Sequence, residues 1–165
     1  MKIGKLLLPA SGLLALGMSL WWLRRCYLVA TVEGPSMEPT LRSGDRLLVR
    51  RTRRVRAGQI VVVKIPNPPA VDGLPPGLDP GDADKVRERS DPGWHLLVKR
   101  VVAVAGDPVP RRAFPALRDV PGAVVPPRAL VVLGDNPDTS WDSRDFGFVR
   151  DDQFIGVMVR ALPSA

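Results

Sequence analysis

Hydrophobic residues divide the chain into one long apolar segment near its start and a series of short apolar runs. The long segment covers residues 6–23, which pass for eighteen residues without a charge. As a helix it would reach about 27 Å, close to the thickness of the hydrocarbon core of a bilayer. We therefore predict a transmembrane helix and assign residues 1–25 to an N-terminal membrane anchor.

The far end of this segment supports the same interpretation. Trp21 and Trp22 stand where amphipathic rings favour the membrane interface, and Arg24 and Arg25 end the apolar segment. A cleaved signal peptide is the competing interpretation, but these four residues occupy the place of the small residues that precede a cleavage site. An uncleaved, single-pass anchor is therefore favoured. Positive charges at both ends leave its orientation open.

Short runs rich in Val, Ile and Leu follow, each bounded by Gly, Pro or Asp. They cover residues 27–33, 47–51, 60–65, 96–104, 129–133 and 154–161. This pattern is typical of β-strands joined by tight turns, and no long stretch outside the anchor carries helical periodicity. We predict a mainly β domain over residues 26–165.

Two stretches between these runs lack the strand pattern. Residues 66–92 are dominated by proline and glycine, which predicts an exposed and partly disordered insertion. Residues 108–127 are expected to form an excursion between strands rather than a second domain.

The net charge of +7 narrows the choice of partners. A basic balance favours anionic partners, either nucleic acid or an acidic lipid surface, although a coding bias towards arginine would produce the same numbers. Aromatic residues are few and do not alternate with the arginines, so no nucleic-acid partner is expected. The single cysteine, Cys26, excludes an intramolecular disulfide.

Three segments carry candidate chemistry, and the first is Gly-Pro-Ser-Met-Glu-Pro-Thr-Leu at residues 34–41, followed by Ser-Gly-Asp at 43–45. Ser36 lies between a predicted strand and a proline-containing turn, where a hydroxyl can be held rigidly and exposed. Gly34 is expected to let another part of the backbone approach closely. Taken alone, the segment could also be an ordinary turn.

The second segment, residues 99–107, places Lys99 at the head of an apolar run. A lysine acts as a base only when neutral, so its ordinary pKa of about 10.4 must fall. Burial among Leu96, Val98 and Val101 would lower it. The alternative is an edge-strand lysine whose amine reaches water.

The third segment, residues 134–147, is a polar loop dense in turn residues and hydrogen-bonding groups. Such a loop can fix the geometry of a site built from other segments. The alternative is a solvated turn held by Asp–Arg pairs.

In this order, the three segments resemble the bacterial type I signal peptidases and their mitochondrial inner-membrane relatives. The matching residues are Ser36, Met37, Pro39, Thr40 and Leu41, then Lys99, Arg100, Val101, Gly106 and Asp107, then Gly134, Asp135, Asn136, Ser140, Asp142, Ser143, Arg144 and Gly147. Each motif is moderately specific, and the ordered set is highly specific.

The resemblance implies a β-rich fold and a Ser/Lys dyad. Ser36 would attack the scissile carbonyl, and Lys99 would take the proton of its hydroxyl and later donate one to the leaving amine. Ser140 would orient the lysine. Asp135 would pair with Arg100, and Asp142 with Arg144, to hold the loop against the dyad.

The resemblance also implies how substrate is bound. The backbone N–H of Ser36 would be one oxyanion donor. Val32, Met37 and Val98 match positions that line shallow apolar pockets for small side chains. Gly34 stands where some members carry a serine that supplies a second oxyanion donor, so that donor stays unassigned. No motif places the single histidine, His95, near Ser36, which argues against a Ser-His-Asp triad.

The implied function is removal of signal peptides from exported precursor proteins, with the catalytic domain on the extracytoplasmic face of the cell membrane. Membrane lipids and precursors would be its partners, and we expect no cofactor and no metal. Self-cleaving SOS-response repressors also use Ser and Lys, but they carry a DNA-binding helix-turn-helix and no anchor. The remaining alternative is a membrane-tethered basic module that binds anionic polymers through the arginines at 46, 50, 51, 53, 54 and 56.

Overall fold

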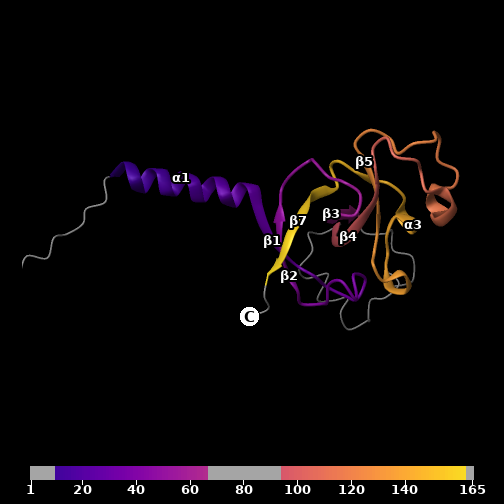
Figure 1. Cartoon of the computed structure of the whole chain (residues 1–165), viewed down its shortest axis with the longest axis horizontal. Coiled ribbons are helices and arrows are strands. Elements are labelled where there is room, and N and C mark those ends of the chain that lie inside the picture. The colour runs from indigo at the N-terminus through magenta and orange to yellow at the C-terminus, as the bar shows by residue number, and fades with distance from the viewer. Residues whose placement is uncertain (1–9, 67–93, 163–165) are drawn as a thin grey trace, which may run out of the picture.

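The structure is a computed structural model that describes residues 10–66 and 94–162 (Figure 1). Its regular elements, in chain order, are α1 (Ala10–Cys26), β1 (Tyr27–Thr31), β2 (Arg46–Arg50), β3 (Ile60–Pro66), β4 (Trp94–Val104), η1 (Arg111–Ala113), η2 (Pro115–Leu117), β5 (Ala129–Leu133), η3 (Pro137–Thr139), α3 (Ser143–Phe146), β6 (Val149–Arg150) and β7 (Phe154–Leu162). The η elements are single 3₁₀ turns.

The strands form one seven-stranded sheet in the order β1-β2-β7-β3-β4-β5-β6. Every neighbouring pair is antiparallel. The predicted mainly β fold is therefore confirmed. Strand β4 lies inside the sheet between β3 and β5, with Lys99 opposite Val61 on one side and Arg100 opposite Leu133 on the other.

Strand β3 shows why the short runs are uniformly apolar rather than alternating. Successive side chains of a strand point to opposite faces of the sheet. Val62 packs in a cluster with Met37 and Leu47, whereas Val61 and Val63 pack in another cluster around Val132. Both faces of this strand are thus covered, and each face selects branched apolar residues.

The predicted strand bounds agree with the structure to within about two residues. Residues 129–133 form a strand with the predicted bounds, and the ends of the other strands differ by at most two residues. The excursion over residues 108–127 contains the turns η1 and η2, and Pro108 bridges Val124. Strand β6 was not predicted. Apart from Pro66, the predicted insertion over residues 66–92 lies outside the described residues.

The N-terminal segment contains a helix, whose described part runs for 17 residues to Cys26, with Arg24 and Arg25 in its last turn. Basic side chains suit a last helical turn because they face its negative dipole end. Within the described residues no helix has both the length and the apolarity needed to cross a bilayer. Residues 6–9 of the predicted span lie outside the described part.

Helix α1 leads into the sheet without a linker. It ends at Cys26, β1 begins at Tyr27, and the Arg51 N–H donates to the Cys26 carbonyl over 2.8 Å. In Figure 1 the helix projects away from the β domain. The position of the domain relative to the helix end is therefore held by backbone contacts.

Candidate active site

Lys99 lies in the interior of the protein. Its side chain is 2% exposed, on a strand that has neighbours on both sides. The alternative of an edge-strand lysine that reaches water is therefore wrong for this structure. The pKa of Lys99 falls from 10.5 to about 8, because burial and, to a smaller extent, the charge of Arg144 lower it more than the charges of Asp142 and Asp145 raise it.

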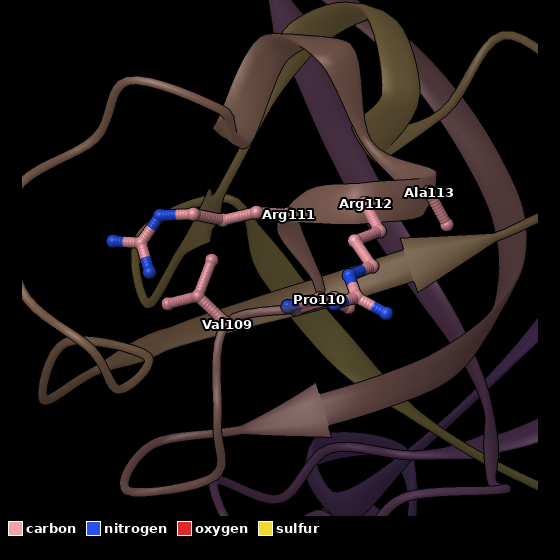
Figure 2. A pocket seen from close by; sticks show the side chains of 5 residues that line it. All are labelled: Val109, Pro110, Arg111, Arg112 and Ala113. Atoms are coloured by element: carbon pink, nitrogen blue, oxygen red, sulfur yellow. The ribbon is translucent and has the colours of Figure 1, made fainter.

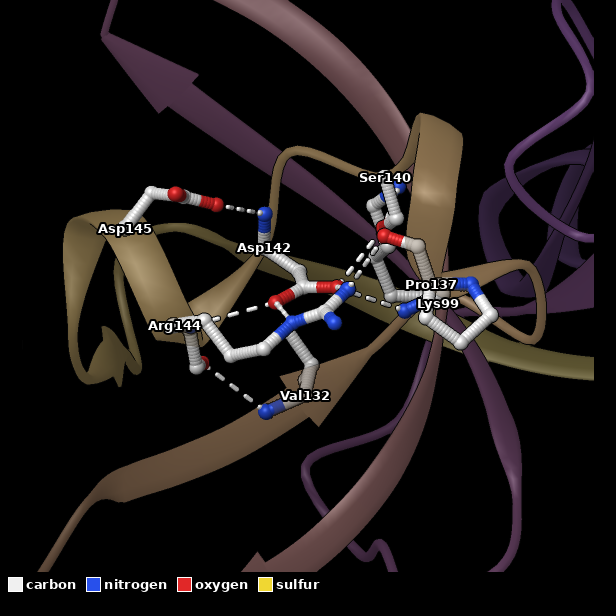
Figure 3. Close-up of polar contacts among 9 residues, drawn as sticks. Lys99, Val132, Pro137, Ser140, Asp142, Arg144 and Asp145 are labelled. Carbon is white, nitrogen blue, oxygen red and sulfur yellow. Dashed lines mark hydrogen bonds and ion pairs between the residues drawn. The ribbon is translucent and has the colours of Figure 1, made fainter. Parts of the chain in front are cut away.

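The Lys99 amine forms a hydrogen bond with Ser140. Lys99 Nζ donates to Ser140 Oγ over 2.9 Å, and Ser140 Oγ donates in turn to Asp142 Oδ2 over 2.7 Å (Figure 3). Ser140 comes from the end of the η3 turn, 41 residues after Lys99. All three side chains are buried, so these hydrogen bonds are shielded from competition with water.

Asp142 is the centre of the polar network. Its carboxylate is fully buried and accepts hydrogen bonds from the Gly134 N–H and from the guanidinium and backbone N–H of Arg144. Burial alone would raise the pKa of Asp142, but the hydrogen bonds from Arg144, Gly134 and Ser140 outweigh it and hold the pKa below its ordinary value. The group is therefore an anion at neutral pH. The predicted pairing of Asp142 with Arg144 is present.

Asp142 also begins helix α3. Its side chain caps the first turn while Asp145 Oδ2 accepts from the Asp142 N–H, which together form a capping box. The Ser143 hydroxyl accepts from the Val132 N–H over 3.0 Å and ties this helix to β5. One short helix therefore fixes the carboxylate that holds Ser140.

Arg100 and Asp135 form a second fixed pair. Two guanidinium nitrogens of Arg100 donate to the two oxygens of Asp135, at 2.7 and 2.6 Å, and a third donates to the Gly58 carbonyl. The Arg100 fork holds the pKa of Asp135 below its ordinary value against the effect of burial, and a hydrogen bond from the Thr40 hydroxyl adds to the lowering. Since Thr40 belongs to the segment of Ser36, Asp135 connects that segment to the strand of Lys99.

Ser36 is half-buried in the loop between β1 and β2. Its carbonyl accepts from the Asn136 N–H over 3.0 Å. A Cβ at Gly134 would lie 2.6 Å from the Ser36 carbonyl oxygen and 2.2 Å from Ser140 Oγ. The Ser36 backbone and the hydroxyl that binds Lys99 therefore contact the same glycine.

The Ser36 hydroxyl forms no hydrogen bond to Lys99 among the contacts of the described residues. Catalytic hydrogen bonds are often long without substrate and shorten when it binds. The described geometry brings Ser36 and Lys99 to the same part of the molecule through Gly134 and Ser140.

Gly34 is needed for a different reason from the predicted one. A Cβ on Gly34 would meet nothing within 4 Å, so no backbone approaches it closely. Its φ of +78° is a conformation that favours glycine. Its N–H donates to the Ser43 hydroxyl over 3.3 Å.

The three residues predicted to contact substrate differ in accessibility. Val32 and Met37 are 2% and 0% exposed and pack in the cluster that contains Val62. Val98 is half-buried and packs against that cluster, so it presents accessible surface.

His95 lies on β4, four residues before Lys99, and its ring packs edge-on against Trp141 with the centroids 6.4 Å apart. Four residues of strand separate the two positions by about 13 Å.

A shallow pocket of about 420 Å³ lies in the excursion, lined by residues 109–113 (Figure 2). It contains none of the predicted site residues. Arg111 there donates to the Val120 and Gly122 carbonyls and so closes the loop. No cluster of His, Cys, Asp and Glu within residues 10–66 and 94–162 could hold a metal ion.

The sequence did not predict the structural roles of Thr40, Asp145 and Gly134 at the site. The Asp-x-x-Asp spacing of residues 142–145 is a capping signal that could have located α3. Nothing in the sequence shows that Gly134 must be small or that Thr40 reaches Asp135, because both facts depend on segments that meet only in the folded chain.

Comparison with known proteins shows the family of this chain. Residues 2–114 and 111–162 match the family described as signal peptidase, peptidase S26. Signal peptidase I of Bacillus caldolyticus is 33% identical over 141 residues, covering 76% of this chain and 73% of that protein. Signal peptidase IB of Staphylococcus aureus (strain Mu50 / ATCC 700699) is 29% identical over 152 residues, covering 76% and 72%. The chain therefore belongs to the type I signal peptidase family, peptidase S26, whose members are serine peptidases.

Proposed function

We propose that this chain is a membrane-tethered endopeptidase that cleaves signal peptides from exported precursors, with Ser36 as nucleophile and Lys99 as general base. The observation that carries the proposal is the buried Lys99 amine, which donates to Ser140 and has a pKa lowered to about 8. Such an amine is partly neutral near physiological pH and can accept a proton. The relatives named signal peptidase support the substrate class.

In the acylation step, neutral Lys99 accepts the proton of the Ser36 hydroxyl while the oxygen attacks the scissile carbonyl carbon. The lysine ammonium then gives that proton to the leaving amine as the C–N bond breaks, which leaves an ester on Ser36. In deacylation Lys99 takes a proton from the attacking water and returns it to the Ser36 oxygen. The protons balance without a cofactor or metal.

Ser140 and Asp142 position the base in this scheme. A neutral lysine amine has two N–H groups and one lone pair. Because the Ser140 hydroxyl donates to Asp142, it can only accept from Lys99. That contact takes one N–H of the amine and leaves the lone pair for the Ser36 proton.

The Asp135–Arg100 pair is proposed to hold the nucleophile loop. Asp135 joins Arg100, the neighbour of Lys99, to Thr40, which lies four residues after Ser36. The Asn136 N–H adds a direct contact to the Ser36 carbonyl. Neither residue needs to touch the substrate to act in this way.

Substrate selection is proposed to depend on shallow apolar pockets and one backbone donor. Val98 offers accessible surface, while Val32 and Met37 fill the space beneath and limit the depth of a pocket. A shallow pocket favours small side chains before the scissile bond. The Ser36 N–H would donate to the oxyanion. Gly34 has no side chain to add a second donor.

Membrane tethering is proposed for residues 1–25, with residues 26–165 as the catalytic domain on the extracytoplasmic face. Support comes from the exposed apolar side chains of Met18, Trp21 and Trp22 on α1. Lipids and signal-peptide-bearing precursors would then be the partners. A helix that leads directly into β1 would also hold Ser36 near the membrane surface.

The deciding experiment compares the full chain with its Ser36→Ala variant on a precursor that carries a signal peptide. The parent should release the mature protein, and the variant should not. Cleavage by the variant at the parent rate would reject Ser36 as nucleophile. A parent that does not cleave but binds anionic polymer through its arginines would favour the basic binding module instead.

A further inference from the structure

A second shallow pocket, of about 370 Å³, lies where the end of α1 meets the segment after β2. Trp21, Arg24, Arg25 and Arg51 line it. The 2.8 Å hydrogen bond from the Arg51 N–H to the Cys26 carbonyl joins its two walls through the backbone. This contact fixes the backbone of Arg51 next to the end of α1.

Within the described part of the chain, no carboxylate compensates the charge of this pocket. Among the described residues, none of the Arg24, Arg25 and Arg51 guanidinium groups has a carboxylate partner. Elsewhere in the protein, Arg100 and Arg144 each pair with an aspartate. Three guanidinium groups around one hollow attract an anion, and their planar forks match the oxygens of a phosphate.

The position of the pocket along α1 indicates which kind of molecule would supply a phosphate to it. Trp21 and Trp22 are 59% and 61% exposed, and Met18 and Leu23 are also exposed. The apolar surface of the helix thus gives way to arginine within one turn. Trp21 also lies under the Arg25 guanidinium, 5.1 Å from its ring centroid. This order of apolar, aromatic and cationic groups matches the order of acyl chain, interface and phosphate in a lipid leaflet.

From these observations we infer that the pocket formed by Trp21, Arg24, Arg25 and Arg51 binds the phosphate of an anionic phospholipid. The arginines hold the phosphate oxygens, and the exposed face of α1 lies along the acyl chains. A zwitterionic choline lipid carries the same phosphate, but its ammonium group would face three arginines. The pocket therefore selects lipids with an anionic headgroup. This inference extends the proposed membrane tethering and does not depend on the peptidase chemistry.

The test measures lipids retained by the full chain in native mass spectrometry from non-ionic detergent, with phosphatidylglycerol and phosphatidylcholine of equal acyl chains supplied together. The parent should retain phosphatidylglycerol preferentially. Arg51→Gln should lower the ratio of the two bound lipids about fivefold, because it removes one of the three close charges that hold the anionic headgroup and repel the choline ammonium. Arg54→Gln is the matched control, because it removes the same charge from an exposed residue of the same segment outside the pocket, and with diffuse attraction screened by salt it should change the ratio less than about twofold.

The comparison is made in about 0.5 M salt, where a Debye length of about 4 Å suppresses diffuse attraction. Equal losses in the two variants would reject a defined pocket. Glycerol 3-phosphate has the headgroup chemistry without acyl chains and should displace little lipid. Full displacement by it would assign the pocket to soluble phosphates. If the unmodified protein shows no preference for phosphatidylglycerol but binds oligothymidylate through Arg51, the pocket would be assigned to nucleic acid. Assignment to soluble phosphates or to nucleic acid would overturn the inference of a lipid site.

Discussion

The Lys99 amine donates a 2.9 Å hydrogen bond to the Ser140 hydroxyl, although 41 residues separate the two in the sequence. The hydroxyl donates its own hydrogen bond to Asp142, so the direction of both hydrogen bonds is set by a carboxylate that stays ionised. This relationship leaves the lysine lone pair as the one basic site of the network. The first predictions follow from that property.

Replacing Lys99 by arginine should abolish peptidase activity. A guanidinium does not deprotonate at any accessible pH, so the variant has no base. Loss of kcat/KM of at least about a thousandfold is expected, as for other nucleophile–base units. Hydrolysis of a synthetic signal-sequence peptide measures it, with circular dichroism to establish folding. His95→Ala should keep most of the activity, and a Lys99→Arg variant that stays active would reject the Ser/Lys assignment.

The activity of the parent should rise with pH. Because burial lowers the pKa of Lys99 to about 8, kcat/KM should climb about tenfold per pH unit well below pH 8 and level off above it. Asp142 raises the Lys99 pKa through its charge, so Asp142→Asn should move the midpoint to lower pH. Peptide hydrolysis between pH 6 and pH 10 measures both profiles. A rate that does not change across this range would contradict a lysine base.

Replacing Lys99 by methionine should stabilise the fold at neutral pH. The Lys99 pKa falls from 10.5 in the free side chain to about 8 in the fold, so between these values the unfolded chain binds the proton more strongly. Stability of the parent therefore rises from pH 8 to pH 10.5, by up to about 3 kcal/mol, and the variant lacks this rise. Urea unfolding of both proteins at pH 7 and pH 10.5 isolates the difference. If the difference in unfolding free energy between the parent and the variant is the same at both pH values, burial does not lower the pKa of Lys99 as argued.

Adding one methyl group at Gly134 should inactivate the site. The new Cβ would lie 2.2 Å from Ser140 Oγ and 2.6 Å from the Ser36 carbonyl oxygen, so both groups must move. Overpacking of this kind costs about 1–3 kcal/mol of stability. In Gly134→Ala we also expect kcat to fall about a hundredfold or more, because a 1 Å displacement of reacting groups is enough for that.

Gly156→Ala provides the matched control for this variant. Its Cβ would meet the Arg50 carbonyl oxygen at 2.5 Å, a comparable clash between β2 and β7 that involves no predicted site residue. It should lose similar stability and keep its kcat per folded molecule. Equal losses of kcat in the two variants would show that Gly134 has no special relation to the site.

Separating α1 from β1 should impair cleavage of membrane-inserted precursors. The helix passes into the strand between Cys26 and Tyr27, which fixes the height of Ser36 above the helix end. A flexible Gly/Ser spacer of about twenty residues at this junction would have a root-mean-square span of about 25 Å. Cleavage of inserted precursors should slow or shift in position, while hydrolysis of a short soluble peptide stays constant. Unchanged cleavage of the inserted precursors would show that the anchor only concentrates the enzyme.

Much of the fold could be predicted from local pattern alone. Residues 129–133 form a strand with the predicted bounds because an uninterrupted run of apolar residues between turn residues has few other conformations in a packed domain. The family could be predicted because Ser36, Lys99 and Ser140 stand in three motifs with a specific order. Arg24 and Arg25 end the apolar segment but lie inside the last turn of α1, since charge marks the end of an apolar segment but not of a helix.

Other features depend on contacts between distant segments. Strand β6 has two residues, too few for a periodic pattern, and exists only because β5 pairs with it. The φ of +78° at Gly34 results from the path of its loop and not from contact with a close neighbour. Gly134, by contrast, must be small because the Ser36 segment and Ser140 converge on it.

The sequence by itself determined the residue types of the site, the apolar strands that carry it and the order in which they appear. The tertiary structure alone decided that the pKa of Lys99 is lowered to about 8, so that much of the amine is neutral near that pH. That property requires strands on both sides of β4 to exclude water, and it requires Asp142 to stay close enough to orient Ser140 without restoring the full basicity of the amine. Desolvation and charge depend on distances in space, and these exist only once residues far apart in the chain have met.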